Sequence, residues 1–261
     1  MVPTELSDDI RFKKLRTFNG IMGVLHAVQG AIILALTNDF ALPVQSNFLR
    51  YDPVTETISQ NLETIIEIPI GPLIAAFLFI TAFVHFSVAT YAYPWYVRKV
   101  GSGINPARWY EYSITSSIMI VIIAMLSGVY DLGALLAIIA ANAGMNLFGL
   151  MMELHNQRTE RTDWTSFYFG SLVGGVPWIV IIVYFLGAVS GNSGTVPTFV
   201  YVLIVVLLIF WITFPVNMVL QYRKVGRWKN YLYGERGYVI LSLVSKSALA
   251  WIVFGGTLRG G

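Results

Sequence analysis

Seven apolar runs, each long enough to cross a lipid bilayer, constrain this chain more than any other feature. A spanning helix needs about 20 mostly apolar residues, and only 12% of the 261 residues are charged, against about a quarter in a soluble domain. The sequence therefore predicts an all-α membrane protein, a seven-helix bundle forming one domain over residues 1–261. The helices are expected at residues 15–36, 68–91, 109–130, 134–155, 167–189, 199–222 and 233–256.

The positions of the basic residues predict the orientation of the bundle. Lysine and arginine gather in the connections on the cytoplasmic side of a membrane protein, and 14 of the 17 basic residues fall on one side of the seven predicted helices. Only Arg50 and Arg259 fall on the other side, and Lys246 lies within the last helix. We therefore expect a multi-pass cell-membrane protein with its N-terminus inside and its C-terminus outside.

The connection between the first two helices, residues 38–67, is the longest one and is expected outside. Residues 55–59, Thr-Glu-Thr-Ile-Ser, alternate in a way that suits a strand. A connection of this length is usually functional or held by contacts, so a β-hairpin is one prediction. The alternative is a flexible acidic loop.

Lys246 is the most unusual residue of the predicted helices. It lies about 13 residues into the last one, roughly 20 Å along its axis, with apolar stretches on both sides. A lysine at that depth costs several kcal/mol unless it is paired, hydrated or neutral. Two interpretations are open: an imine formed with a conjugated aldehyde, or a charge in the water-filled path of a transporter.

An acidic partner is expected for Lys246, and Glu111 is the candidate. It lies within the body of the third predicted helix, whereas Asp131 and Glu153 lie near helix ends. The alternative is a pair with Arg108, three residues earlier, since such pairs are common on helices. The polar residues that follow Glu111 favour a counterion role over this pair. They are Ser113, Thr115, Ser116 and Ser117.

Two histidines lie deep in the predicted helices. His26 is in the middle of the first helix, and His85 is in the inner half of the second, one turn from Thr81. Together near Glu111 they suggest a polar cavity toward the cytoplasm that holds water and takes up a proton. The alternative is that each is an ordinary buried histidine. His155, at the inner end of the fourth helix, is expected at the membrane interface.

Three tryptophans lie within predicted helices, namely Trp178, Trp211 and Trp251. With Asn142, Met145 and Gly149 of the fourth helix they could line a long, flat slot. Ordinary packing of a bundle is the alternative for each. Other aromatic residues near helix ends, such as Trp109, are expected at the membrane interface.

Several segments resemble the heliorhodopsins, and the resemblance covers essentially the whole chain. Residues 108–113, Arg-Trp-Tyr-Glu-Tyr-Ser, look like the start of that family's third helix. Residues 238–251, Tyr-Val-Ile-Leu-Ser-Leu-Val-Ser-Lys-Ser-Ala-Leu-Ala-Trp, look like its retinal-binding helix. Residues 38–43, 228–232 and 234–236 are further matches.

This resemblance implies a light-sensing protein that carries all-trans retinal on Lys246 as a protonated Schiff base, with Glu111 as its counterion. It implies that His26 and His85 belong to a proton-accepting cavity on the cytoplasmic side, and that the protein is a homodimer held partly by its first extracellular loop. The family often has Ser at the position of Thr81 and Phe at that of Trp211. The implied site also contains Ser242, Thr81, Tyr112, Ser116, Asn142, Met145, Gly149, Trp178 and Trp211.

The expected activity is internal proton transfer after photoisomerisation, without ion pumping. Pumping needs a relay to the opposite side, and the outer halves of the third to seventh helices contain no suitable carboxylate. We expect no enzymatic activity, no metal and no nucleic acid, and an unknown cytoplasmic signalling partner on the basic loops. The alternatives are a light-gated proton channel, a transporter using Lys246 and Glu111, and a zinc-dependent membrane hydrolase, which would need a third ligand beside His26 and His85.

Overall fold

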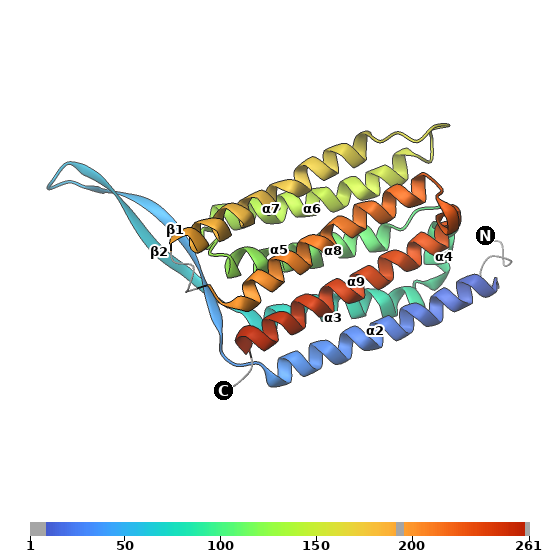
Figure 1. Cartoon of the computed structure of the whole chain (residues 1–261), viewed down its shortest axis with the longest axis horizontal. Coiled ribbons are helices and arrows are strands. Elements are labelled where there is room, and N and C mark those ends of the chain that lie inside the picture. The colour runs from blue at the N-terminus through green and yellow to red at the C-terminus, as the bar shows by residue number, and fades with distance from the viewer. Residues whose placement is uncertain (1–8, 192–195, 259–261) are drawn as a thin grey trace.

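The computed structural model describes residues 9–191 and 196–258, a range that leaves out Arg259. It contains seven helices long and apolar enough to cross a membrane, which lie side by side in one bundle (Figure 1). They are α2 (Ile10–Leu36), α3 (Ile70–Ala89), α5 (Pro106–Leu126), α6 (Leu132–His155), α7 (Thr165–Gly191), α8 (Thr198–Tyr222) and α9 (Tyr231–Val253), which a π-helical turn (Phe254–Leu258) continues. The predicted seven-helix bundle is confirmed.

The ends of α5 show how local sequence sets a helix boundary. Pro106 occupies the first turn, where its missing N–H costs nothing, and the Asn105 side chain caps the helix by accepting a hydrogen bond from the Arg108 N–H at 3.2 Å. The helix ends at Leu126, four residues before the expected end. Gly128 has a φ of +98°, a conformation that only glycine adopts readily, and it turns the chain toward α6.

The connection between α2 and α3 is a β-hairpin of two long antiparallel strands, β1 (Ala41–Asp52) and β2 (Thr57–Pro69). The hairpin projects from one end of the bundle, where the last turn of α9 also lies (Figure 1). We call this end the hairpin end. The base of β1 is fixed to the bundle, because the Gln45 N–H donates to the Tyr130 carbonyl at 2.8 Å and Leu42 and Val44 are buried. The predicted hairpin is confirmed.

A short helix that the sequence analysis missed, α4 (Tyr93–Gly101), lies at the opposite end of the bundle, which we call the α4 end (Figure 1). Its nine residues lie outside the helices expected from the sequence, because they contain too few turns for a clear periodic signal. One face is buried against the start of α2 by Tyr96, Val97 and Val100, while Arg98 is exposed. The helix thus covers the ends of α2 and α3.

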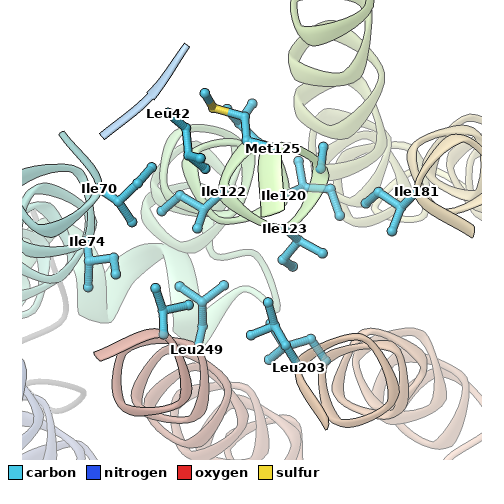
Figure 2. Close-up of a cluster of buried hydrophobic side chains, with 14 of the residues drawn as sticks. Leu42, Ile70, Ile74, Ile120, Ile122, Ile123, Met125, Ile181, Leu203 and Leu249 are labelled. Carbon is cyan, nitrogen blue, oxygen red and sulfur yellow. The ribbon is translucent and has the colours of Figure 1, made fainter. Parts of the chain in front are cut away.

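The hairpin half of the bundle is filled mainly by aliphatic side chains, which come from all seven spanning helices and from β1 (Figure 2). Buried apolar residues of this kind are close-packed in protein interiors. We call this cluster the aliphatic plug. Its central members are Leu42, Ile70, Ile74, Ile120, Ile122, Ile123, Met125, Ile181, Leu203 and Leu249, all at most 9% exposed.

Candidate functional site

Lys246 lies on α9 in the middle of the bundle and is only 2% exposed. Its ammonium Nζ donates to Glu111 Oε1 on α5 at 2.9 Å and to Ser242 Oγ at 2.7 Å. Ser242 lies four residues earlier, and helical residues four apart share one face. The lysine that the sequence analysis singled out is therefore paired with the acid expected for it.

Glu111 is held by hydroxyl groups as well as by Lys246. Thr81 Oγ1 on α3 donates to Glu111 Oε1 at 2.6 Å, and Thr115 Oγ1, one turn along α5, donates to the same oxygen at 2.7 Å. Both threonines are buried. Hydrogen bonds to an ionised carboxylate stabilise its charged form. Thr115 was not among the predicted site residues, although its spacing of four from Glu111 could have indicated it.

A cavity of about 170 Å³ extends from Lys246 between α5, α6, α7 and α8. Its walls are mainly aromatic and aliphatic, and Trp178 and Trp211 stand with ring centroids 6.1 Å apart. An amine at one wall of a mainly apolar space suits a long conjugated aldehyde such as retinal. The predicted residues that line this cavity are Tyr112, Ser116, Asn142, Met145, Gly149, Trp178 and Trp211, and those missed include Trp109, Phe210, Phe214 and Tyr238.

The glycine at position 149 is required by the close approach of Trp109. A Cβ added there would overlap Trp109 Cζ3, so only glycine lets the indole ring pack directly against α6. Trp109 is 5% exposed and lines the cavity, which corrects its prediction as an interface residue. Trp251 also differs from expectation: it is 40% exposed, lies outside the cavity lining and donates to Gln29 Oε1.

Polar side chains line the α6 side of the cavity. Asn142 Nδ2 and Asn146 Nδ2 donate to Ser116 Oγ at 2.7 and 3.0 Å. Ser116 Oγ in turn donates to the Tyr112 carbonyl at 2.6 Å. The hydroxyl and the two amides thereby satisfy one another within an otherwise apolar wall, which fixes their orientation.

His26 and His85 stack with ring centroids 5.6 Å apart and ring planes within 8°. His85 Nδ1 lies 2.8 Å from Asn19 Oδ1, whereas neither ring nitrogen of His26 has a hydrogen-bond partner among the described residues. The structure thus brings the two predicted histidines together. Across the described ranges, no three His, Asp or Glu side chains group as ligands for a metal ion.

A second, smaller space, which we call the polar cavity, lies on the α4 side of Glu111. Its volume is about 30 Å³, enough for at least one water molecule. It links the surroundings of Lys246 with the covering helix α4. Its polar lining residues are Asn19, Thr81, His85, Tyr96, Asn105, Arg108, Glu111, Tyr112, Glu235 and Ser242.

Arg108 is the centre of a buried ion cluster with Glu153 of α6 and Glu235 of α9. The alternative interpretation, a pair between Arg108 and Glu111, is therefore wrong. Glu153, expected near a helix end, is 1% exposed, and the role of Glu235 as a buried acid was missed. A sequence signal existed: Glu235 precedes Lys246 by about three helical turns and so shares its face of α9.

A bundle of seven spanning helices, with a buried lysine at the wall of an aromatic cavity, defines the rhodopsin-like class of membrane proteins. The chain belongs to the heliorhodopsin family, whose model matches residues 15–258. It is accordingly a light-sensing retinal protein that crosses the membrane several times.

Among solved structures, cyanorhodopsin from the cyanobacterium Tolypothrix sp. NIES-4075 is similar, with a TM-score of 0.57 over 94% of this chain and 93% of that one. The two sequences are 14% identical, so this likeness shows the fold alone. A comparison with curated proteins finds no match.

Proposed function

We propose that this protein is a photoreceptor in which Lys246 carries all-trans retinal as a protonated Schiff base and Glu111 is its counterion. The observation that carries the proposal is the position of Lys246 Nζ, 2.9 Å from Glu111 Oε1 and at the wall of the aromatic cavity. Bound retinal would supply light absorption and a change of shape about a double bond. The residues around it would hold it and manage the proton at Nζ.

Glu111 keeps that proton in place before illumination. A buried cation is stable only with a nearby opposite charge, and Thr81 and Thr115 fix the carboxylate oxygen that faces Nζ. A movement of Nζ away from this oxygen weakens the attraction, so the proton is released more easily. The polar cavity, with His85 beside its water-sized space, is the nearest acceptor region. His26 stacks on His85 and belongs to the same acceptor region.

Internal proton transfer without pumping follows from the two unequal halves of the bundle. Polar groups extend from Glu111 toward the α4 end, whereas the aliphatic plug fills the half toward the hairpin. Among the described residues, a proton released at Nζ therefore meets the polar cavity toward the α4 end and mainly apolar side chains toward the hairpin. We expect it to return by the same route, with neither net transport nor an enzymatic reaction.

The orientation that we propose places the α4 end in the cytoplasm. The basic residues near helix ends, including Arg98, Arg158 and Arg223, belong to connections at that end, and cytoplasmic connections carry an excess of such residues. The hairpin would then be extracellular. It exposes Leu49, Ile58 and Leu62, apolar surface that suits the proposed homodimer. The basic loops would offer a surface to the unknown signalling partner.

Reconstitution with all-trans retinal tests the proposal. The purified chain should acquire a visible absorption band, which Lys246→Ala abolishes and which hydroxylamine bleaches under light. Asn38→Ala, far from the cavity at the end of α2, should keep the band. A chain that stays colourless with retinal would refute the proposal and leave the transporter or zinc-hydrolase interpretations to be tested by zinc content and ion flux.

Photocurrent recording tests the absence of transport. Cells that express the coloured protein should give no sustained retinal-dependent current or change of external pH under steady light. A sustained current with a reversal potential that follows the proton gradient would instead favour a light-gated proton channel, and a current independent of that gradient would indicate a pump.

A further inference from the structure

The ion cluster of Arg108, Glu153 and Glu235 carries more acid than base. One guanidinium faces two carboxylates, and all three side chains are at most 4% exposed. With both acids ionised, the cluster has one excess negative charge. Such a charge away from water is costly and favours the uptake of one proton.

Glu153 is poorly suited to take up this proton. Besides Arg108, its oxygens accept from the Asn105 N–H at 2.8 Å, the Trp109 indole N–H at 2.8 Å and the Tyr231 hydroxyl at 2.9 Å. Three of these four donors are N–H groups, which cannot accept a hydrogen bond in return. Protonation of Glu153 would weaken three N–H hydrogen bonds, whereas protonation of Glu235 would weaken two.

Glu235 has a weaker set of donors and a group that can reverse its role. Its oxygens accept from Arg108 and, at 2.6 Å, from Asn105 Nδ2. The Tyr96 hydroxyl is 3.5 Å from Oε1, the long limit of a hydrogen bond. Because a hydroxyl can also accept, the Tyr96 hydroxyl oxygen can accept a hydrogen bond from a protonated Glu235. Glu235 Oε1 accepts from Asn105 and Oε2 from Arg108, and these two hydrogen bonds stabilise the carboxylate before illumination.

Glu235 also faces the space into which a proton from Lys246 would move. It lines the polar cavity together with Glu111, whereas Glu153 is not part of that lining. The titratable or charged groups that face or surround Glu235 come from every neighbouring element. They are Arg108, Glu111 and Tyr112 of α5, Glu153 of α6, Tyr96 of α4, His85 of α3, and Tyr231 and Tyr238 of α9.

We propose that Glu235 is the carboxylate that stores the proton released at Lys246 Nζ after illumination. The N–H bond at Nζ breaks and its electron pair stays on nitrogen. A covalent O–H bond forms on Glu235, and this O–H donates a hydrogen bond to the Tyr96 hydroxyl oxygen. Water or His85 of the polar cavity carries the proton from Nζ to Glu235. The inference rests on the proposed function, because it needs a light-driven release of that proton.

Infrared difference spectroscopy of the full, retinal-loaded chain tests this role. The state in which Nζ has lost its proton is recognised by its blue-shifted absorption, and in it a protonated-carboxyl C=O band should appear. This band should be lost in Glu235→Gln, shifted in Glu235→Asp and shifted upward in Tyr96→Phe, which removes the acceptor. The exposed acid Glu160 provides the control, since Glu160→Gln should keep the band unchanged.

A second measurement does not depend on light. In the retinal-free chain, a pH titration followed in the infrared should show one buried carboxyl taking up a proton, and Glu235→Asp should shift its band. A blue-shifted state without a C=O gain, or with a gain that survives in Glu235→Gln, would overturn the role of Glu235 alone. A wild-type chain without colour, or without any blue-shifted state, would instead refute the proposed function.

Discussion

Arg108 and Glu111 lie one turn apart on α5, yet their side chains belong to different charge systems. Arg108 pairs with Glu153 and Glu235, and Glu111 pairs with Lys246. An arginine paired with Glu111 would partly neutralise the negative charge of its carboxylate. Because the guanidinium is engaged elsewhere, the carboxylate is left to balance the nitrogen of Lys246.

Replacing Glu111 with Gln should red-shift the visible band of the retinal-loaded protein. The carboxylate stabilises the positive charge near Nζ more in the ground state than in the excited state. Its loss therefore lowers the energy difference between the two states, and the band moves to longer wavelength. The visible form should also give way to a near-ultraviolet form at a lower pH than in the wild type, because a neutral amide no longer favours the charged nitrogen. Absorption spectra across a pH series measure both effects.

Glu111→Asp, which keeps the charge, serves as the control and should shift the band much less. An unchanged spectrum in Glu111→Gln would mean that another acid, such as Glu235, balances the charge.

Thr81→Val should shift the band in the opposite direction, to the blue, and by less. The substitution keeps the shape of the side chain but removes one of the hydroxyl donors to Glu111 Oε1, so more of the negative charge faces Nζ. Thr90→Val, just past the end of the same helix, is the matched control, since the Thr90 hydroxyl donates only to the Phe86 carbonyl one turn earlier. A red shift in Thr81→Val would contradict the hydrogen bond to the counterion.

Gly149→Ala should impair retinal binding and destabilise the protein. The new methyl group would overlap Trp109, which must move into the cavity, and overpacking of this kind costs about 1–3 kcal/mol. The yield of coloured protein and its thermal stability in detergent measure the effect. Gly144→Ala on the same helix meets its nearest atom, Val173 Cγ1, at 3.8 Å and should be neutral or stabilising.

Arg108→Met should destabilise the folded bundle by about 3–5 kcal/mol, because it leaves two carboxylates buried without a cation. The thermal midpoint of the purified protein should fall accordingly. Arg158→Met replaces an exposed arginine and should leave the midpoint nearly unchanged. A small effect at Arg108 would show that both acids are already protonated in the folded state.

The number and approximate bounds of the spanning helices could be predicted because an apolar run of about 20 residues is rare outside a membrane span. The pairing of Lys246 with Glu111 could be proposed from depth and charge alone, and the structure brings these residues together. The helix α4 could not be predicted, because its nine residues contain too few turns for a clear periodic signal.

The partners of Arg108 could not be predicted, for a physical reason. The spacing along α5 allows Arg108 to contact Glu111. The arginine side chain instead reaches Glu153 of α6 and Glu235 of α9, and it is the cation that these two acids share. Such long-range partners depend on how helices pack, which one sequence does not specify. Trp109 was expected at the interface and is buried, whereas Trp251 was expected in the slot and is exposed. The reason is the same, since hydropathy does not tell which face of a helix meets lipid.

The aliphatic plug limits how far charge can travel during illumination. A proton that shuttles only between Lys246 and the α4 end crosses a fraction of the membrane's electric field and then reverses. A flash should therefore produce a capacitive signal whose outward and return components integrate to zero. Acidifying the medium on the hairpin side should leave the recovery time unchanged, whereas the same step on the other side should alter it.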